Sequence, residues 1–272
     1  MIAYPAMLDV PTELAAFVAE LLAAERLARG TRALRCTDQA LFAPVWFREN
    51  REVALIGRGL GISQATSYRY LDEAIGVLAA RAPDLHAALA RGHEEGWSHV
   101  VLDGKVVDTD RLRVKTLSKK GKIIDAWYSG KTHDFGGNIQ ALFRPDGLPV
   151  WVSPVEPGGV HDLTAACEHV LGARTPPPVM DYRPLPIPAT KAQVTASTPR
   201  SSNPPNGSEL DITTRTRNML LRSLRCLGER GFALLTQRWR TLQHVTLSPS
   251  KISKIARAAL VLTHLEHSYL AC

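Results

Sequence analysis

The chain has 272 residues, a formal net charge of +7 and a pI near 9.4. It is long enough for a main domain and a smaller module. Its positive charge favours a polyanionic partner, and the alternative explanation of this charge is a soluble protein with an Arg-rich composition. Its scattered cysteines exclude a disulfide framework or a zinc site based on C-x-x-C pairs. No apolar run approaches about 18 residues and no secretory leader is recognisable, so we expect a cytoplasmic protein that does not enter a membrane.

The N-terminal third is predicted to be helical. Apolar residues at helical spacing indicate an amphipathic helix from Pro11 to Arg29. A second helix is expected over residues 37–50, with Thr37 as its N-cap and Pro44 as the point where it bends or divides. A third is expected over residues 51–60. These helices belong to a predicted all-α region, residues 1–92.

A helix-turn-helix is predicted at the end of this region. Gly61 is suited to the turn, and Ser63 is placed to cap a helix that runs to about Leu78. Gln and Arg side chains can read base edges, and Ser or Tyr can hold phosphates. We therefore expect four DNA-binding residues on the open face of the second helix: Gln64, Ser67, Arg69 and Tyr70. An ordinary helical hairpin with a polar outer face is the alternative.

Strand signals begin after the polar link at residues 91–96. The run WSHVVLD at 97–103 is apolar and rich in β-branched residues, and it ends on Asp103, where a carboxylate is a natural metal ligand. A second short run ends on Asp108 and Asp110, which we expect to be supporting or surface groups. Residues 138–155 predict two strands joined by a turn at 145–147.

Helical signals return after this hairpin. A glycine-rich turn runs into a helix over 157–172, where Asp162 is expected to be a helix cap and not a metal ligand. Residues 211–242 predict a long basic helix that contains Glu229, and residues 250–267 a final amphipathic one. A central antiparallel hairpin flanked by helices fits a ribonuclease-H-like α/β domain over residues 97–267. The predicted fold class is thus α/β, with an all-α module in front.

Four segments resemble bacterial insertion-sequence transposases of the DDE superfamily, which are Harbinger-like and join a helix-turn-helix to an endonuclease domain. The matching segments are LDG at 102–104, YSGKTHDFGGNIQ at 128–140, VSPVEPGGVHDLTAA at 152–166 and GERGFALLTQRWRTL at 228–242. Each is unspecific alone, but their order and spacing together are specific.

The resemblance implies a catalytic set of two aspartates and one glutamate that hold two Mg²⁺ ions. Hard Mg²⁺ requires carboxylate oxygens, and two ions stabilise the attacking and leaving oxygens of a phosphodiester. Carried over by position, the first aspartate is Asp103 and the glutamate is Glu229. The implied activity is metal-dependent cutting and joining of double-stranded DNA at element ends, with a homo-oligomer left open. The alternative is an inactive remnant that only binds DNA.

The family's second aspartate is missing from its expected place. It should lie in a segment of the form Ala-Asp-x-Gly-Tyr-x-Gly-Ala-Gly, but residues 174–208 instead contain nine of the chain's eighteen prolines. Such a stretch predicts an extended or disordered loop and no interior strand. Asp181 is its only carboxylate before Glu209, and so the remaining candidate for the lost metal ligand.

A change of reading frame offers an explanation for this loss. Read two bases further on, the codons of Met180 to Thr198 permit the missing motif, with its Asp codon straddling Pro186 and Ile187. We therefore hypothesise two compensating frame changes, near residues 172–179 and 200–208. The chain would then be a frame-disrupted copy, and the nucleotide sequence tests this directly.

Overall fold

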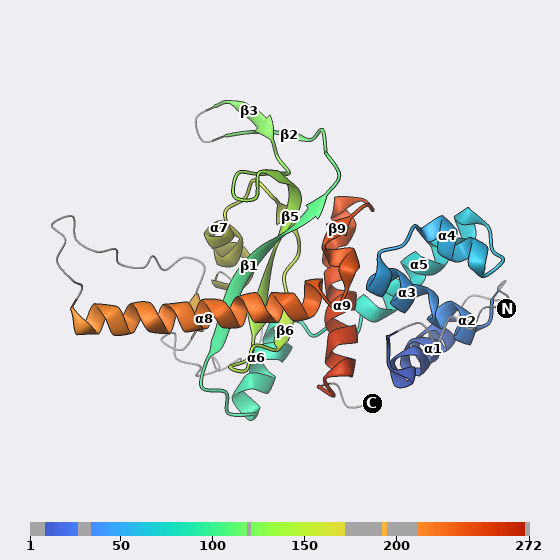
Figure 1. Ribbon diagram of the computed structural model, residues 1–272, viewed down its shortest axis with the longest axis horizontal. Coiled ribbons are helices and arrows are strands. Elements are labelled where there is room, and N and C mark those ends of the chain that lie inside the picture. Colours follow the sequence, from blue (N-terminus) through green and yellow to red (C-terminus); the bar gives the residue numbers. More distant parts are fainter. Residues whose placement is uncertain (1–8, 27–33, 119–120, 172–191, 195–210, 270–272) are drawn as a thin grey trace, which may run out of the picture. The chain divides into compact units, whose positions relative to one another are not determined.

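The computed structural model describes residues 9–26, 34–118, 121–171, 192–194 and 211–269 (Figure 1). The chain forms two compact units, the first made of residues 1–82 and 235–272 and the second of residues 83–234.

The first unit is almost entirely helical. Its N-terminal part contains α1 (Thr12–Arg26), α2 (Cys36–Ala40), α3 (Phe42–Glu49), α4 (Val53–Gly59) and α5 (Gln64–Ala79). Its C-terminal part contains η5 (Arg240–Leu242), β9 (His244–Val245), η6 (Pro249–Lys251) and α9 (Ile252–Glu266). The two parts share one core, in which α9 packs against α5 and Trp239 meets Phe47 edge to face, with ring centroids 6.3 Å apart.

The predicted helix over residues 37–50 forms as two helices, and two details of the prediction are wrong. The N-cap of α2 is Arg35, not Thr37, and it makes no side-chain capping bond. The division falls at Leu41 and not at Pro44, because Pro44 lies in the first turn of α3, where a proline does not interrupt helical hydrogen bonding. The predicted cap at Ser63 is confirmed, since its hydroxyl accepts a hydrogen bond from Thr66 N at 3.2 Å.

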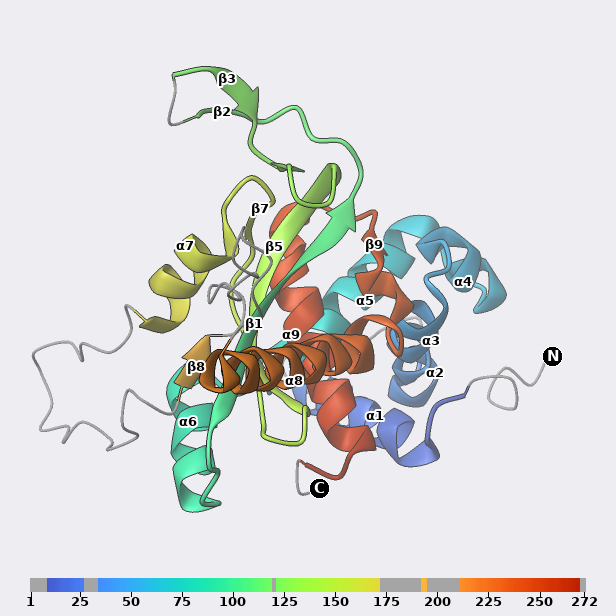
Figure 2. The same ribbon diagram turned by 60° about the vertical axis from the view of Figure 1, so that its left-hand side comes forward.

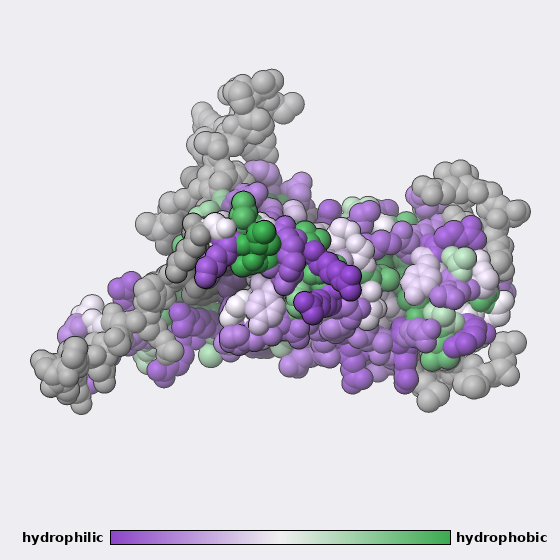
Figure 3. Space-filling model, turned by 90° about the horizontal axis from the view of Figure 1, so that it is seen from above, coloured by the Kyte–Doolittle hydropathy of each residue, from purple (hydrophilic) through white to green (hydrophobic). Residues whose placement is uncertain are grey.

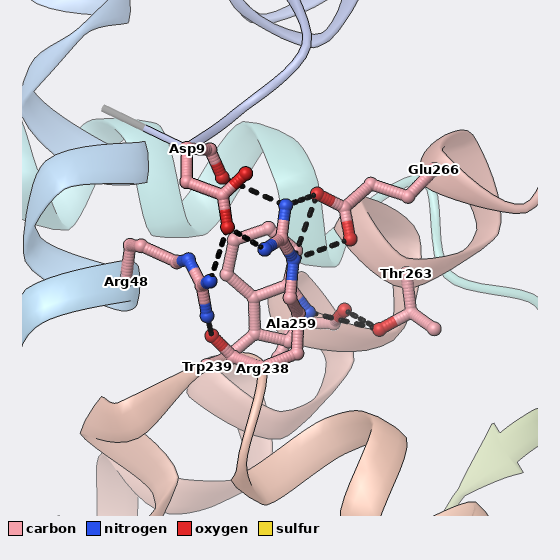
Figure 4. A network of polar contacts seen from close by, with 7 residues as sticks. All are labelled: Asp9, Arg48, Arg238, Trp239, Ala259, Thr263 and Glu266. Atoms are coloured by element: carbon pink, nitrogen blue, oxygen red, sulfur yellow. Dashed lines mark hydrogen bonds and ion pairs between the residues drawn. The ribbon is translucent and has the colours of Figure 1, made fainter. Parts of the chain in front are cut away.

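A network of ion pairs joins the first and last parts of this unit (Figure 4). The Arg238 guanidinium donates to Glu266 Oε2 at 2.8 Å and to Asp9 Oδ2 at 2.7 Å. Arg48 donates to the same Asp9 oxygen at 2.6 Å and to the Arg238 carbonyl at 2.7 Å. Next to it, Trp239 Nε1 donates to Thr263 Oγ1 at 2.9 Å. The network therefore fixes residues that are more than two hundred positions apart in sequence.

The second unit is a mixed α/β structure built around one sheet (Figure 2). Its main strands are β4 (Tyr128–Ser129), β5 (Asp134–Phe143), β1 (Val100–Thr109) and β8 (Ala192–Val194), in that order, while β6 (Pro149–Val152) and β7 (Glu156–Pro157) also pair with β5. A separate hairpin contains β2 (Lys115–Leu117) and β3 (Ile123–Asp125). The helices are α6 (Leu85–Glu94), α7 (Asp162–Ala166) with η2 (Cys167–Leu171), and α8 (Ile212–Thr236).

The α/β class and the hairpin over 138–155 are confirmed, but two expectations for this unit are corrected. The strand that was predicted to end at Asp103 continues to Thr109, because β5 pairs with it as far as Asp108. The residues expected as a polar link include the end of α6, whose N-cap Asp84 accepts from Ala87 N at 2.7 Å. Within the proline-rich stretch, residues 192–194 form the edge strand β8, parallel to β1, which is compatible with the expectation of no interior strand there.

The two glycines of α8 allow this helix to lie close to the sheet, as both ribbon views show (Figures 1 and 2). A Cβ atom at Gly231 would lie 2.2 Å from Phe143 Cδ1 on β5, and one at Gly228 would lie 2.6 Å from Asp103 Oδ2 on β1. Both positions therefore lack room for a side chain. The helix thus brings the residue after Gly228, which is Glu229, near Asp103.

The face shown in Figure 3 is mostly hydrophilic, with smaller hydrophobic patches. None of the helices in the described ranges has the length and apolar character required to cross a membrane.

Candidate active site

Asp103 lies within β1, one residue beyond the described pairing of this strand with β8. Gly104, the residue after Asp103, pairs with Gln140 of β5. The Gln140 N–H donates to Ser153 Oγ at 2.9 Å, and the Gln140 carbonyl accepts from Ser153 N at 2.8 Å. Gly104, which pairs with Gln140, therefore directs its own N–H away from β5. Strand β8 pairs only as far as Leu102, and the Gly104 N–H donates to Asp103 Oδ1 at 3.0 Å. The carboxylate thus folds back onto the edge of its own strand.

Glu229 is exposed on α8, immediately after the glycine that contacts Asp103. It forms no ion pair with any side chain in the described ranges, although arginines precede and follow it on the helix. Both residues that were carried over as metal ligands are therefore present at one place in the second unit. The basic helix predicted over residues 211–242 ends earlier than expected, at Thr236. Arg238 and Arg240 therefore lie beyond the helix, and Arg238 is bound to Asp9 and Glu266.

Three polar side chains joined by hydrogen bonds, Asp162, Asn138 and Gln140, lie on the other side of β1 from the Asp103 side chain, next to Gly104. Asp162 accepts from Asn138 Nδ2 through Oδ1 at 2.9 Å and from Lys131 Nζ through Oδ2 at 2.8 Å. Gln140 Nε2 in turn donates to Asn138 Oδ1 at 3.0 Å. Asp162 is not the helix cap that was predicted: the N-cap of α7 is His161, and the Asp162 carboxylate is directed to the strand instead. Sequence alone did not reveal this role, because Asn138 and Lys131 are distant from it along the chain.

Gly104 leaves a small space between these groups. A Cβ atom at this position would lie 3.0 Å from both Asp162 Oδ1 and Gln140 Oε1, and 2.5 Å from Gln140 Nε2. Gln140 is fully buried, and its Oε1 accepts no hydrogen bond within the part of the chain that the structure describes. A buried acceptor without a donor is costly unless a ligand or water supplies its partner.

The electrostatics of Asp103 reflect this environment. The pKa of Asp103 is raised to about 6, chiefly by burial and also by the negative charges of Asp162 and Glu229, while the Gly104 N–H and the Lys131 ammonium act to lower it. Like charges gathered near a buried carboxylate are typical of sites that bind cations or perform acid–base chemistry. Oxygen atoms of this kind are also the ligands that Mg²⁺ prefers.

The described residues contain no group of three or more His, Cys, Asp or Glu side chains that could together hold one metal ion. Asp181, the remaining candidate for a third ligand, lies outside the described residues, as does most of the segment 174–208. Asp110 is exposed just beyond the end of β1.

The predicted DNA-binding residues of α5 fall into two groups. Gln64 and Arg69 are exposed near the start of the helix, as expected for an open face. Ser67 and Tyr70 are only 0% and 2% exposed, so their predicted exposure is wrong. Ser67 faces Gly57 of α4 and donates to the Ser63 carbonyl at 2.9 Å, while the Tyr70 hydroxyl accepts from Leu34 N at 3.3 Å.

The match to known families covers Asp103, Asp162 and Glu229. A family model for the DDE superfamily endonucleases matches residues 102–264, which is more than half of the chain. No curated protein and no solved structure matches the chain.

Proposed function

Since the chain belongs to the DDE superfamily endonucleases, whose substrate is DNA, we propose that it is a bacterial, Harbinger-like insertion-sequence transposase. It would cut and join DNA at the ends of its element with the help of divalent metal ions. The observation that carries this proposal is the partly buried Asp103 carboxylate, which lies against Gly228 and next to Glu229 inside the matched region. A ribonuclease-H-like fold is consistent with the mixed α/β sheet of the second unit.

In this proposal, Asp103 and Glu229 bind the metal ions. Bound Mg²⁺ supplies Lewis-acid stabilisation of the charge that develops on phosphodiester oxygens. With a pKa of about 6, Asp103 is mostly ionised at neutral pH and can act as a ligand without a separate base. The exposed arginines of α8, Arg222 and Arg230, supply positive charge for backbone phosphates beside the carboxylates.

The helix pair α4 and α5 would act as the helix-turn-helix that binds the element ends. Gly61, with a φ of +70°, forms the turn, and the Ser63 cap begins the second helix. The exposed Gln64 and Arg69 are the proposed base-reading residues. The buried Ser67 and Tyr70 would hold the two helices in place instead of contacting phosphates.

A nicking assay tests the proposed activity. Full-length protein is incubated with Mg²⁺ or Mn²⁺ and a duplex that carries the DNA flanking its coding sequence. We expect metal-dependent strand cleavage that Asp103→Ala abolishes and that Asp110→Ala, a change at an exposed carboxylate nearby, leaves intact. Cleavage that survives Asp103→Ala would show that the catalytic assignment is wrong.

The second candidate function is a DNA-binding remnant without catalysis. It is favoured by the lack of a three-carboxylate cluster among the described residues and by the proposed frame disruption of residues 174–208. Binding of the same duplex without cleavage would support this alternative. Codons that are incompatible with the shifted motif would contradict the frame hypothesis.

Replacement of the exposed residues of α5 tests the DNA-binding assignment separately. The double change Gln64→Ala and Arg69→Ala should weaken specific binding by about 1–3 kcal/mol for each lost base contact. Replacing Arg35, which is exposed but outside this helix, with Ala provides the control. Unchanged affinity and specificity in a gel-shift titration would count against the assignment.

A further inference from the structure

The hairpin of β2 and β3 follows the end of β1 and forms a two-stranded sheet of its own. Both ribbon views show it standing apart from β1 and β5 (Figures 1 and 2). At its base, Ala126 N donates to the Val114 carbonyl at 2.9 Å, and near its turn Ser118 N donates to the Lys122 carbonyl at 2.8 Å. Isolated two-stranded hairpins are at best marginally stable in water, so a partner that covers this one would stabilise it.

Large apolar side chains are exposed on both faces of this hairpin. Leu117 and Ile123 lie directly opposite each other across the two strands and are 69% and 74% exposed. Ile124 points to the other face and is 41% exposed, and Val114 at the base is 53% exposed. A group of exposed apolar side chains on one short element is typical of a contact surface.

The same hairpin is strongly basic. Residues 111–125 contain six Lys or Arg residues and one Asp, a net charge of +5, compared with +7 for the whole chain. The Asp, Asp125, is bonded to Lys115 at 2.5 Å, and Arg113 and Lys122 are exposed. Two such hairpins would repel each other, and lysines on strand edges discourage pairing between copies. The charge therefore favours a polyanionic partner over a second copy of the chain.

From these observations we propose that the β2–β3 hairpin binds in a groove of double-stranded DNA. The major groove of B-form DNA admits a two-stranded β-ribbon. Arg113 and Lys122 contact phosphates in this arrangement, while Leu117 and Ile123 contact base edges such as the thymine methyl group.

This inference rests on the proposed action on DNA and adds to it a contact surface outside α5. The hairpin belongs to the same unit as the candidate active site, and about 20 Å of strand separate Asp103 from the end of β1. The hairpin would thus hold the duplex at a short distance from the place where it is cut.

The salt dependence of DNA binding tests the basic residues. Full-length protein is titrated, in the presence of a chelator, into a fluorescent duplex that carries the DNA flanking its coding sequence. Arg113→Gln combined with Lys122→Gln should make the slope of log affinity against log salt concentration shallower by about two, one for each lost phosphate contact. The control, Arg81→Gln with Lys254→Gln, removes two exposed charges from the first unit and should leave the slope unchanged.

The apolar pair is tested in the same titration. Leu117→Ser combined with Ile123→Ser should lower the affinity about tenfold without changing the salt slope, because no charge is removed. Leu163→Ser, at a 50% exposed residue of α7, is the control and should bind as wild type does. The charge variant provides an independent test should the serine variant fail to fold.

The outcomes separate this proposal from the one on which it rests. If the wild-type protein binds no duplex, both the action on DNA and the hairpin contact are wrong. If wild type binds but both hairpin variants keep its affinity and salt slope, only the hairpin contact is wrong. A serine variant that changes the oligomeric state in sedimentation velocity but not the DNA affinity would identify the hairpin as an interface between copies, which also overturns the proposal.

Discussion

Charged side chains gather at two places in this chain, around Arg238 in the first unit and around Asp103 in the second, and the two groups are built differently. At Arg238 opposite charges alternate, since two arginines are bound by Asp9 and Glu266. At Asp103 the charges of Asp162 and Glu229 have the same sign as its own, and the exposed Lys131 compensates only in part. The first arrangement is electrostatically complete, whereas the second lacks positive charge.

This difference indicates what each group does. A partly buried ion network with every charge paired stabilises or fixes a local structure and leaves nothing for a ligand to bind. A group of carboxylates that raises the pKa of its own buried member destabilises the fold until a cation arrives. Removing a charge should therefore have opposite effects on stability in the two units.

The largest effect is expected at Arg238. Replacing it with Ala removes the bonds to Glu266 and Asp9 and leaves the Glu266 side chain, which is only 11% exposed, without this partner. We expect a loss of about 3 kcal/mol in the free energy of unfolding, measured by urea denaturation of the full chain. The control is Arg35→Ala, at an exposed ion pair with Asp38, which should change stability by less than about 0.5 kcal/mol. Equal losses in both variants would contradict the distinction between the two groups.

An effect of similar size but opposite sign is expected at Asp103. The folded chain binds a proton at Asp103 more tightly than the unfolded chain does, because the pKa is about 6 instead of 3.8. Stability therefore falls as the pH rises from about 4 to about 6, and the ionised carboxylate destabilises the fold by about 3 kcal/mol above that range. Asp103→Asn should remove this penalty, so the variant should be more stable than wild type at pH 8 and equal to it near pH 3.5.

Urea denaturation in the presence of a chelator measures this pH dependence. A gain in stability that is the same at both pH values would show that it does not come from ionisation of Asp103. Asp110→Asn, at an exposed carboxylate, should give no gain at either pH.

The smallest effect is expected at Gly228. An added Cβ atom would lie 2.6 Å from Asp103 Oδ2, so Gly228→Ala must displace the carboxylate. We expect a net loss of about 1 kcal/mol, since crowding outweighs the helical preference of Ala over Gly. Gly76→Ala in α5, where no heavy atom lies within 4 Å of the new Cβ, should instead stabilise the protein by about 0.5–1 kcal/mol. A gain in both variants would show that α8 can move away from β1.

The sequence predicted the parts of the structure that depend on local patterns. Apolar spacing located most helices, and the Ser63 cap and the hairpin over residues 138–155 formed as expected. Strand length was predicted less well, because β1 continues past Asp103 only through its pairing with β5. Helix α6 was missed because its capping aspartate, Asp84, precedes a short, weakly patterned stretch.

The candidate site could be predicted only in part, for a related reason. The positions of Asp103 and Glu229 followed from resemblance to a family, and the structure places them in the same region. The environment of Asp162 depends on Lys131, Asn138 and Gln140, which come from other elements and carry no local signal of a shared site. Burial of Ser67 and Tyr70 likewise depends on contacts with residues outside α5, which the helical pattern alone did not resolve.

The close approach of α8 to the sheet has a consequence for how this sequence can diverge. At Gly231 any side chain would collide with Phe143, whether or not the protein still cuts DNA. Exposed Glu229, two positions earlier, is under no such steric constraint. Among descendants that have lost activity but still fold, the glycine should therefore persist while the glutamate drifts, so that selection for folding and selection for catalysis leave separate marks within a single turn of one helix.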